Sequence, residues 1–172
     1  MLSGQEAARV TPTRAASLVF ILAAATICGA LTYQWLGYQP CELCYKERLP
    51  YYAALALAPL AALAAQYGRP ALARGALVII AVFFAADAAL SVYHSGVEWK
   101  IFAGPSDCSG ALTRAQSMDD FLQQLQTVKV VRCDEPGLRV LGLTLANWNV
   151  VVSGVLAFLA ARGARGAGTT AP

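Results

Sequence analysis

Four long apolar stretches constrain this chain more than any other feature of its sequence. They cover residues 15–37, 49–68, 75–97 and 140–161, and only the third contains an acidic residue or a histidine, Asp87 and His94. A helix needs about 20 apolar residues to cross the hydrocarbon core of a bilayer, and each stretch is long enough to do so. We therefore predict an all-α membrane protein built as a four-transmembrane-helix bundle.

The overall composition supports this prediction. Of the 172 residues, 58% are apolar and 13% are charged, whereas a soluble domain carries about 25% charged residues. The net charge of +3 is too small for a surface that binds nucleic acid. These values exclude disorder and most soluble enzymes, and the length suits a single membrane domain over residues 1–172. We expect no cleaved signal peptide, because the first stretch is too long and no small-residue cleavage site follows it.

The basic residues predict how the helices are oriented. Six arginines fall in the two tails and in the short loop after the second stretch: Arg9, Arg14, Arg69, Arg74, Arg162 and Arg165. The loops at 38–48 and 98–139 carry seven bases but also eight acids. The positive-inside rule then places both termini in the cytoplasm and both of these loops outside. In the longer loop we expect a short amphipathic helix from Ser117 to about Val130, and we expect residues 163–172 to form a disordered tail.

Four of the five cysteines fall in the two outer loops: Cys41, Cys44, Cys108 and Cys133. Cys28 lies in the first apolar stretch, where a small packing role is usual. An even number of outer cysteines suggests disulfides in an oxidising compartment. Cys41 and Cys44 have the CxxC spacing of redox-active dithiols. We expect this pair to precede the second helix, with Pro50 in the first turn of that helix.

Two effects would favour a thiolate in the CxxC motif. The amide groups at a helix N-terminus stabilise negative charge, and Arg48 would add a positive charge if helical geometry extends back to Cys44. The alternatives are a purely structural disulfide and a zinc site. Zinc would need all four outer cysteines, and no second CxxC completes the usual ligand pattern. We therefore expect no metal.

Two short motifs carry a resemblance to a known family. Residues 41–52 read CELCYKERLPYY and residues 93–98 read YHSGVE, and two further cysteines follow in the long outer loop. With the hydropathy profile, these motifs resemble the DsbB family, the bacterial inner-membrane oxidases that regenerate the periplasmic thiol oxidant DsbA. The resemblance implies four helices with cytoplasmic termini, a DsbA-like periplasmic partner, and a membrane quinone, ubiquinone or menaquinone, as electron acceptor.

The resemblance also implies a route for the electrons. Reduced DsbA attacks a disulfide between Cys108 and Cys133, which gives a mixed disulfide at Cys108. Cys133 then attacks the other pair and bonds to Cys41. Cys44 is left as a thiolate, which forms a charge-transfer or covalent adduct with the quinone.

Four more residues receive expected roles. By the resemblance, Arg48 stabilises the Cys44 thiolate and the reduced quinone. His94 either donates a hydrogen bond or proton to the quinone or is only an interfacial polar residue. Glu47 is a proton partner at the quinone site or a solvated neighbour, and we favour the latter. Asp87 lies outside the family pattern, and we favour a neutral, hydrogen-bonded packing residue over a proton carrier.

A second hypothesis from another class is a structural four-helix membrane protein whose outer loops are held by inert disulfides. Ready exchange with mild thiols would distinguish the oxidase from this alternative. An aromatic belt at the outer membrane boundary accounts for six aromatic residues without a cofactor: Tyr33, Trp35, Tyr38, Tyr51, Tyr52 and Trp99.

Overall fold

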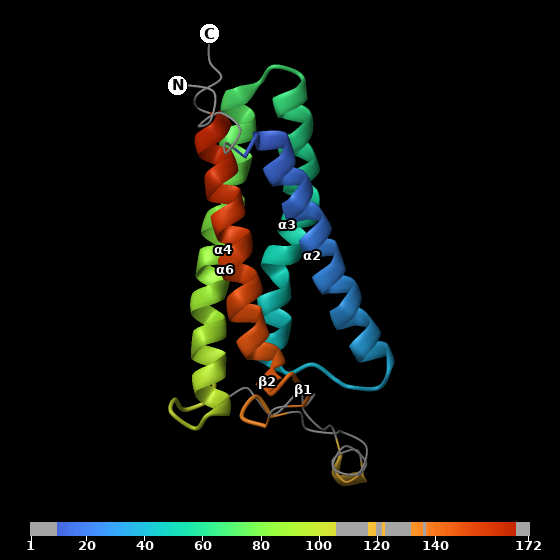
Figure 1. Ribbon diagram of the computed structural model, residues 1–172. Coiled ribbons are helices and arrows are strands. Elements are labelled where there is room, and N and C mark those ends of the chain that lie inside the picture. The colour runs from blue at the N-terminus through green and yellow to red at the C-terminus, as the bar shows by residue number, and fades with distance from the viewer. Residues whose placement is uncertain (1–9, 106–116, 120–121, 123–131, 136, 168–172) are drawn as a thin grey trace.

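The computed structural model describes residues 10–105, 117–119, 122, 132–135 and 137–167. Within these ranges, four long helices form the molecule (Figure 1): α2 (Pro12–Trp35), α3 (Glu42–Gln66), α4 (Pro70–Glu98) and α6 (Leu145–Ala167). Each is long and apolar enough to cross a membrane. The predicted four-helix membrane bundle is therefore confirmed. The predicted helix from Ser117 to about Val130 lies largely outside the described residues.

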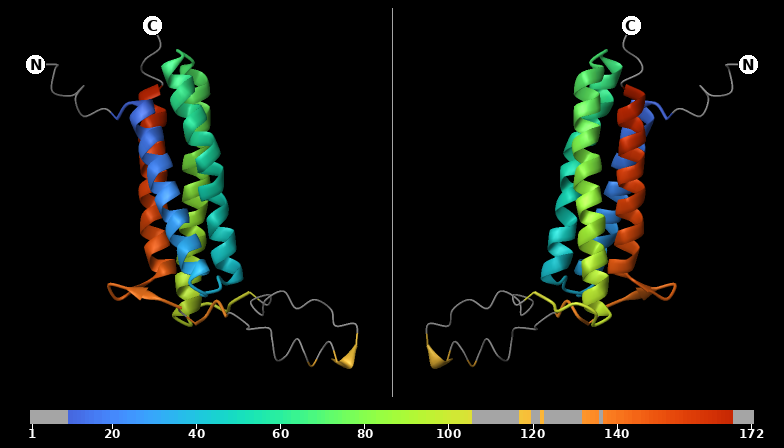
Figure 2. Two further views of the ribbon diagram at one scale, coloured as in Figure 1. Left: turned by 90° about the vertical axis from the view of Figure 1, so that its right-hand side faces the viewer. Right: turned by 90° about the vertical axis from the view of Figure 1, so that its left-hand side faces the viewer.

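The four helices run side by side, as both views in Figure 2 show. Helix α4 packs mainly on α6 and α3, and α2 packs on α3 and α6. The turn between α3 and α4 lies at the same end of the bundle as residues 10 and 167, whereas the α2–α3 connection lies at the opposite end (Figure 1). Both described ends of the chain therefore lie on one side of the bundle.

Small residues fill the helix contacts, and large apolar side chains point outward. More than half of the residues in the main buried cluster are alanines: Ala16, Ala23, Ala54, Ala58, Ala61, Ala76, Ala160 and Ala164. Small residues allow the close helix approach that stabilises bundles in lipid. A Cβ atom added at Gly163 on α6 would lie 2.4 Å from the Cβ of Ala15 on α2. On the outside, Ile21, Val82 and Phe158 are 59%, 59% and 60% exposed, as expected for side chains that contact lipid.

Helix α3 begins at Glu42, seven residues before the expected start at 49. Cys41 caps this helix, because its sulfur accepts a hydrogen bond from the backbone N–H of Cys44 at 3.3 Å. The outer loop is correspondingly shorter than residues 38–48. Pro50 lies inside α3 rather than in its first turn, so that expectation is wrong. The early start places the whole CxxC motif at the helix N-terminus.

The other helix boundaries also differ from the expected ones. Helix α4 begins at Pro70 rather than 75, since proline is well tolerated in a first helical turn. Helix α6 begins at Leu145 rather than 140, because the preceding residues form a hairpin of β1 (Arg139–Val140) and β2 (Leu143–Thr144). At its other end α6 continues to Ala167, where Ala164 and Ala167 are buried. Residues 163–167 of the expected disordered tail are therefore helical.

Candidate functional site

The CxxC cysteines lie at the end of the bundle where α2 connects to α3. Cys41 is buried and Cys44 is partly buried, both are free thiols in this structure, and their Sγ atoms are 2.8 Å apart. A disulfide requires about 2.05 Å, so the pair can close into a disulfide with a movement below about 1 Å. The third free thiol, Cys28, is exposed on α2, so it is not packed inside the bundle.

A buried histidine and a buried glutamate stand behind Cys41. His94 Nε2 on α4 lies 3.6 Å from Cys41 Sγ, and His94 Nδ1 lies 2.9 Å from Glu47 Oε1 on α3. Glu47 is only 6% exposed and His94 only 2%. The expected solvated position of Glu47 is therefore wrong, because a buried carboxylate requires a partner and His94 provides it. A thiol, an imidazole and a carboxylate in series form the arrangement by which enzymes activate a cysteine.

The surroundings of Cys41 favour its thiolate. Hydrogen bonds from Cys44 and from His94 hold the pKa of Cys41 well below the usual thiol value of 9.0, and they outweigh the opposing effect of burial. Its position at the N-terminus of α3 acts in the same direction. In the reduced motif, Cys41 is therefore the thiol whose ionised form the surroundings favour. The Cys44 thiolate implied by the resemblance belongs to another state, in which Cys41 is bonded to Cys133, and it stays a prediction.

The far end of the long outer loop lies directly over this site. Cys133 is 2% exposed, is disulfide-bonded, and belongs to the same buried cluster as Cys41, Leu43 and Val97. Cys108, the other expected cysteine of this loop, lies outside the described residues. Two cysteines 92 positions apart in the sequence thus share one buried environment.

Ion pairs hold this loop segment in place. Both carboxylate oxygens of Asp134 accept from Arg132 at 2.9 Å, and Lys100 beyond the end of α4 donates to Asp134 at 2.5 Å. The two cations, Arg132 first and Lys100 second, lower the pKa of Asp134 to about 2. Cys133 is therefore flanked by residues that are tied to the end of α4.

Arg48 points toward α2. Its guanidinium donates to Gln34 Oε1 at 2.7 Å and to the backbone oxygen of Ala30 at 3.4 Å, and it lies 5.4 Å from the centre of the Tyr45 ring. These hydrogen bonds are not the expected contact with Cys44. Nearby, Tyr33 stacks on Tyr38 with ring centres 4.2 Å apart, and its buried hydroxyl has no hydrogen-bond partner among the described residues. Near the CxxC motif, the guanidinium of Arg48 and the hydroxyl of Tyr33 are thus both found where α2 and α3 meet.

A second buried polar cluster lies deeper in the bundle. Asp87 on α4 is 2% exposed, and its Oδ2 accepts from Ser153 at 2.6 Å and from Asn149 at 3.1 Å. Tyr51 on α3 donates to Asn149 Oδ1 at 2.5 Å, and Asn149 also donates to Ser91 at 2.7 Å. Asp87 is thus the buried, hydrogen-bonded residue that we expected.

The partners of Asp87 were not predicted from the sequence. Tyr51 was expected in an aromatic belt at the membrane boundary, but it is buried. The last apolar stretch did contain a signal for these partners, because two of its polar residues, Asn149 and Ser153, are one helical turn apart.

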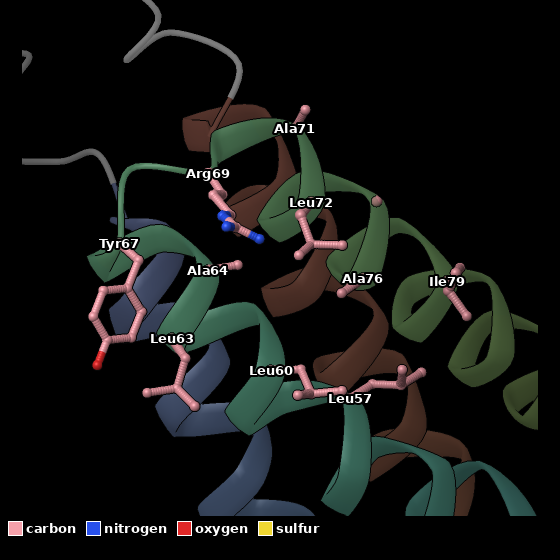
Figure 3. A pocket seen from close by; sticks show the side chains of 11 residues that line it. Leu57, Leu60, Leu63, Ala64, Tyr67, Arg69, Ala71, Leu72, Ala76 and Ile79 are labelled. Atoms are coloured by element: carbon pink, nitrogen blue, oxygen red, sulfur yellow. The ribbon is translucent and has the colours of Figure 1, made fainter.

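An apolar groove lies between α3 and α4 at the other end of the bundle (Figure 3). Leucines such as Leu60, Leu63 and Leu72 line it, and Arg69 points into it. It contains no cysteine, histidine or carboxylate. The groove therefore offers none of the groups needed for thiol chemistry, and the cysteine end is the candidate site.

Comparison with known proteins agrees with this assignment. The family model described as "Disulfide bond formation protein DsbB" matches residues 12–162. No curated protein and no solved structure matches the chain significantly. The matched region includes α2, α3 and α4 in full, α6 as far as residue 162, and every site residue described above. The chain therefore belongs to the DsbB family of membrane proteins for disulfide bond formation.

Proposed function

We propose that this protein is a thiol oxidase of the bacterial inner membrane that reoxidises a DsbA-like periplasmic dithiol protein and passes the electrons to a membrane quinone. One observation carries the proposal: Cys133 from the long loop and Cys41 from the CxxC motif share a buried cluster. Family membership supports the role in disulfide formation. A protein with inert disulfides would not need an imidazole and a carboxylate against one of its free thiols.

The electrons pass between cysteines by thiol–disulfide exchange. The partner's thiolate attacks Cys108 of the Cys108–Cys133 disulfide and forms a mixed disulfide, and Cys133 leaves as a thiolate. Cys133 attacks Cys41 of the Cys41–Cys44 disulfide, and Cys44 leaves. The partner's second thiol then releases the oxidised partner and frees Cys108, which attacks Cys133 and expels Cys41. The chain now holds the partner's two electrons as the Cys41–Cys44 dithiol.

The surroundings of Cys41 assist the last of these exchanges. A thiol with a low pKa is a good leaving group, and the Cys44 amide and His94 stabilise the departing Cys41 thiolate. His94 holds a proton at Nε2 against this sulfur, and Glu47 fixes the ring through Nδ1. Glu47 is therefore a positioning residue that acts through His94.

The residues on the lipid-facing side of Cys44 fit a quinone. Ubiquinone or menaquinone, when bound, accepts two electrons and two protons. Its carbonyl oxygens require hydrogen-bond donors. Two groups can supply them: the hydroxyl of Tyr33, which has no partner among the described residues, and the guanidinium of Arg48, one helical turn from Cys44. Exposed apolar side chains on α2 and α3, such as Leu31 and Leu49, suit an isoprenoid tail. Because both ring nitrogens of His94 are engaged, we assign His94 to Cys41 rather than to the quinone.

Two observations support an orientation with cytoplasmic termini. Both described chain ends lie at the end of the bundle opposite the cysteines (Figure 1), and the two tails and the α3–α4 turn carry six arginines but a single acid, Glu6. The cysteine end then faces the periplasm, where an oxidising environment and a soluble dithiol partner are both available.

The decisive experiment is anaerobic reduction of a short-chain quinone by the purified protein, with a reduced DsbA as the electron donor. Cys44→Ser and Cys133→Ser should each abolish turnover, because either change interrupts the cysteine relay. Cys28→Ser is the matched control and should retain full turnover. Turnover that persists in Cys44→Ser would refute the proposed route. No turnover in the wild type, with quinone and donor active in a control oxidase, would favour the structural alternative.

A further inference from the structure

Three ligands that prefer soft metal ions converge at the cysteine end. The Sγ atoms of Cys41 and Cys44 and a ring nitrogen of His94 all lie within 4.8 Å of one another. The two cysteines come from the N-terminus of α3 and the histidine from the end of α4. Cys41 and His94 are buried, and Cys44 is partly buried. Two of the three ligands are therefore already held in the protein interior, and the third, the sulfur of Cys44, is partly accessible to solvent.

The distance between Cys41 and His94 matches that of a tetrahedral site, and the distance between the two sulfurs is about 1 Å too short. Zinc binds sulfur at about 2.3 Å and nitrogen at about 2.0–2.1 Å, so bound sulfur and nitrogen atoms lie about 3.6 Å apart. Cys41 Sγ and His94 Nε2 are 3.6 Å apart. Two bound thiolates lie about 3.8 Å apart in the same geometry, so the cysteine sulfurs, now 2.8 Å apart, would have to separate by about 1 Å. Cys44 is the partly buried member of the pair, so we expect its side chain rather than that of Cys41 to move.

Glu47 completes the arrangement from behind the histidine. Metal-binding histidines characteristically donate their second ring N–H to a carboxylate, which fixes the tautomer and orients the free nitrogen toward the metal. His94 Nδ1 lies 2.9 Å from Glu47 Oε1, so Nε2 faces the two thiols and can bind a metal once it has released the proton that it holds against Cys41. The carboxylate also offsets part of the charge of a bound cation.

We propose that the reduced protein binds one thiophilic divalent cation, Zn²⁺ or Cd²⁺, through Cys41, Cys44 and His94, and that the bound ion stops disulfide formation. Binding releases to solvent the thiol proton of Cys44 and the proton that His94 Nε2 holds against Cys41, and it moves no electrons. The site exists only in the dithiol form, because oxidation to the Cys41–Cys44 disulfide removes both thiolate ligands. This three-ligand site differs from the four-cysteine zinc site considered from the sequence. The proposal does not depend on the identity of the partner or of the quinone.

The test uses the full chain in detergent with Cys108→Ser and Cys133→Ser, which removes the other cysteine pair. After reduction and anaerobic removal of the reductant, Cd²⁺ is titrated and followed by its thiolate charge-transfer absorption. One equivalent should bind to the reduced protein and none to the oxidised protein. His94→Gln should weaken binding at least tenfold, and Glu47→Gln should weaken it about 10- to 100-fold. Glu42→Gln changes a partly exposed carboxylate at the start of the same helix; it is the matched control and should bind as tightly as its parent.

Equal Cd²⁺ affinity in His94→Gln, with helix content unchanged by circular dichroism, would overturn the proposal, because the ion would then be held by the two thiols alone. Absence of saturable binding at one equivalent would overturn it as well. A second measurement uses the wild type: Cd²⁺ should inhibit quinone reduction when added to the reduced protein, at the concentration that saturates the site. Normal turnover without metal, combined with failure to bind Cd²⁺, would reject this inference and leave the proposed oxidase function intact.

Discussion

Glu47→Gln tests the most specific feature of the site, the buried carboxylate behind His94. Glutamine keeps the size of the side chain and can still hydrogen-bond to His94 Nδ1, but it removes the negative charge that lies 2.9 Å from the ring. A protonated His94 is then less stable, and so is the Cys41 thiolate that pairs with it at Nε2. We therefore expect the pKa of Cys41 to rise and the thiolate population at neutral pH to fall.

The expected loss of rate follows from the one interaction that the substitution changes, the contact between Glu47 and His94. A hydrogen bond to a charged group contributes about 1.5–3 kcal/mol. At about 1.4 kcal/mol per factor of ten, this corresponds to a rate loss of about 10- to 150-fold if Glu47 acts fully in the step that expels Cys41. The burial of Glu47, which is 6% exposed, places the effect toward the upper part of this range because water cannot replace the lost charge.

The assay is stopped-flow measurement of a single turnover, with thiolate absorption and quinone reduction followed at several pH values. Glu47→Gln should shift the thiolate titration to higher pH and slow quinone reduction. Glu42→Gln changes an exposed carboxylate that pairs with Lys46 at 3.2 Å, so it should leave both readouts unchanged. The reasoning would be refuted if Glu47→Gln kept the wild-type pH profile, whatever its effect on stability.

Three further predictions concern the bundle, the loop and the lipid-facing side. Gly163→Ala should lower stability in detergent by about 1–3 kcal/mol through overpacking. Gly154→Ala is the control and should not lower it, because there is open space around the added methyl group. Equal thermal unfolding midpoints for the two variants would contradict this prediction. The pKa of Asp134 is lowered to about 2, so its ion pairs should persist above pH 4 and be lost as the pH falls through 2. Hydrogen exchange of residues 132–135, corrected for the intrinsic exchange rate, should show this loss of protection. Protection already lost at pH 5 would contradict the prediction. Arg48→Ala should raise the KM for quinone more than it slows attack by the partner thiol, and an unchanged KM would remove Arg48 from the quinone site.

The deeper polar cluster explains how an acid is tolerated within the membrane span. Charged groups in a bilayer are expensive unless they face the bundle interior and find partners, and Asp87 accepts from Asn149 and Ser153 on the neighbouring helix. The other oxygen, Oδ1, is buried without a partner among the described residues. The neutral form of Asp87 that we expected from the sequence stays a prediction.

The fold class followed from the sequence because the bilayer imposes a strong local requirement. A segment that enters hydrocarbon must satisfy all of its backbone hydrogen bonds internally, so a long apolar stretch becomes a helix whatever its neighbours are. The first residue of each helix was predicted less accurately than the number of helices. Cys41 and Thr144 begin their helices through caps, and hydropathy does not register a cap.

Which face of each helix points inward could not be read from α3, where apolar residues surround the helix on nearly all sides and the usual amphipathic signal is absent. Glu47 therefore looked like a solvated neighbour, although it is buried one turn from Leu43 and Tyr51. Helix α4 did carry a signal, since its polar residues recur at helical spacing: Asp87, Ser91, His94 and Glu98. That stripe marks the interior face, but it does not say which helix lies opposite.

The sequence alone determined the number of spans, the CxxC motif and the set of chemically competent residues, because these depend on local composition and spacing. Only the tertiary structure decided their pairing. His94 contacts Cys41 across 53 positions of sequence, and Arg48 binds α2 rather than the cysteine one turn before it. Such pairings depend on the rotation of each helix about its axis, and the packing of small residues between helices sets that rotation. The burial of Cys133 beside Cys41 was likewise visible only in the tertiary structure. It depends on the last part of the long outer loop, which the ion pairs of Asp134 with Arg132 and Lys100 hold in place.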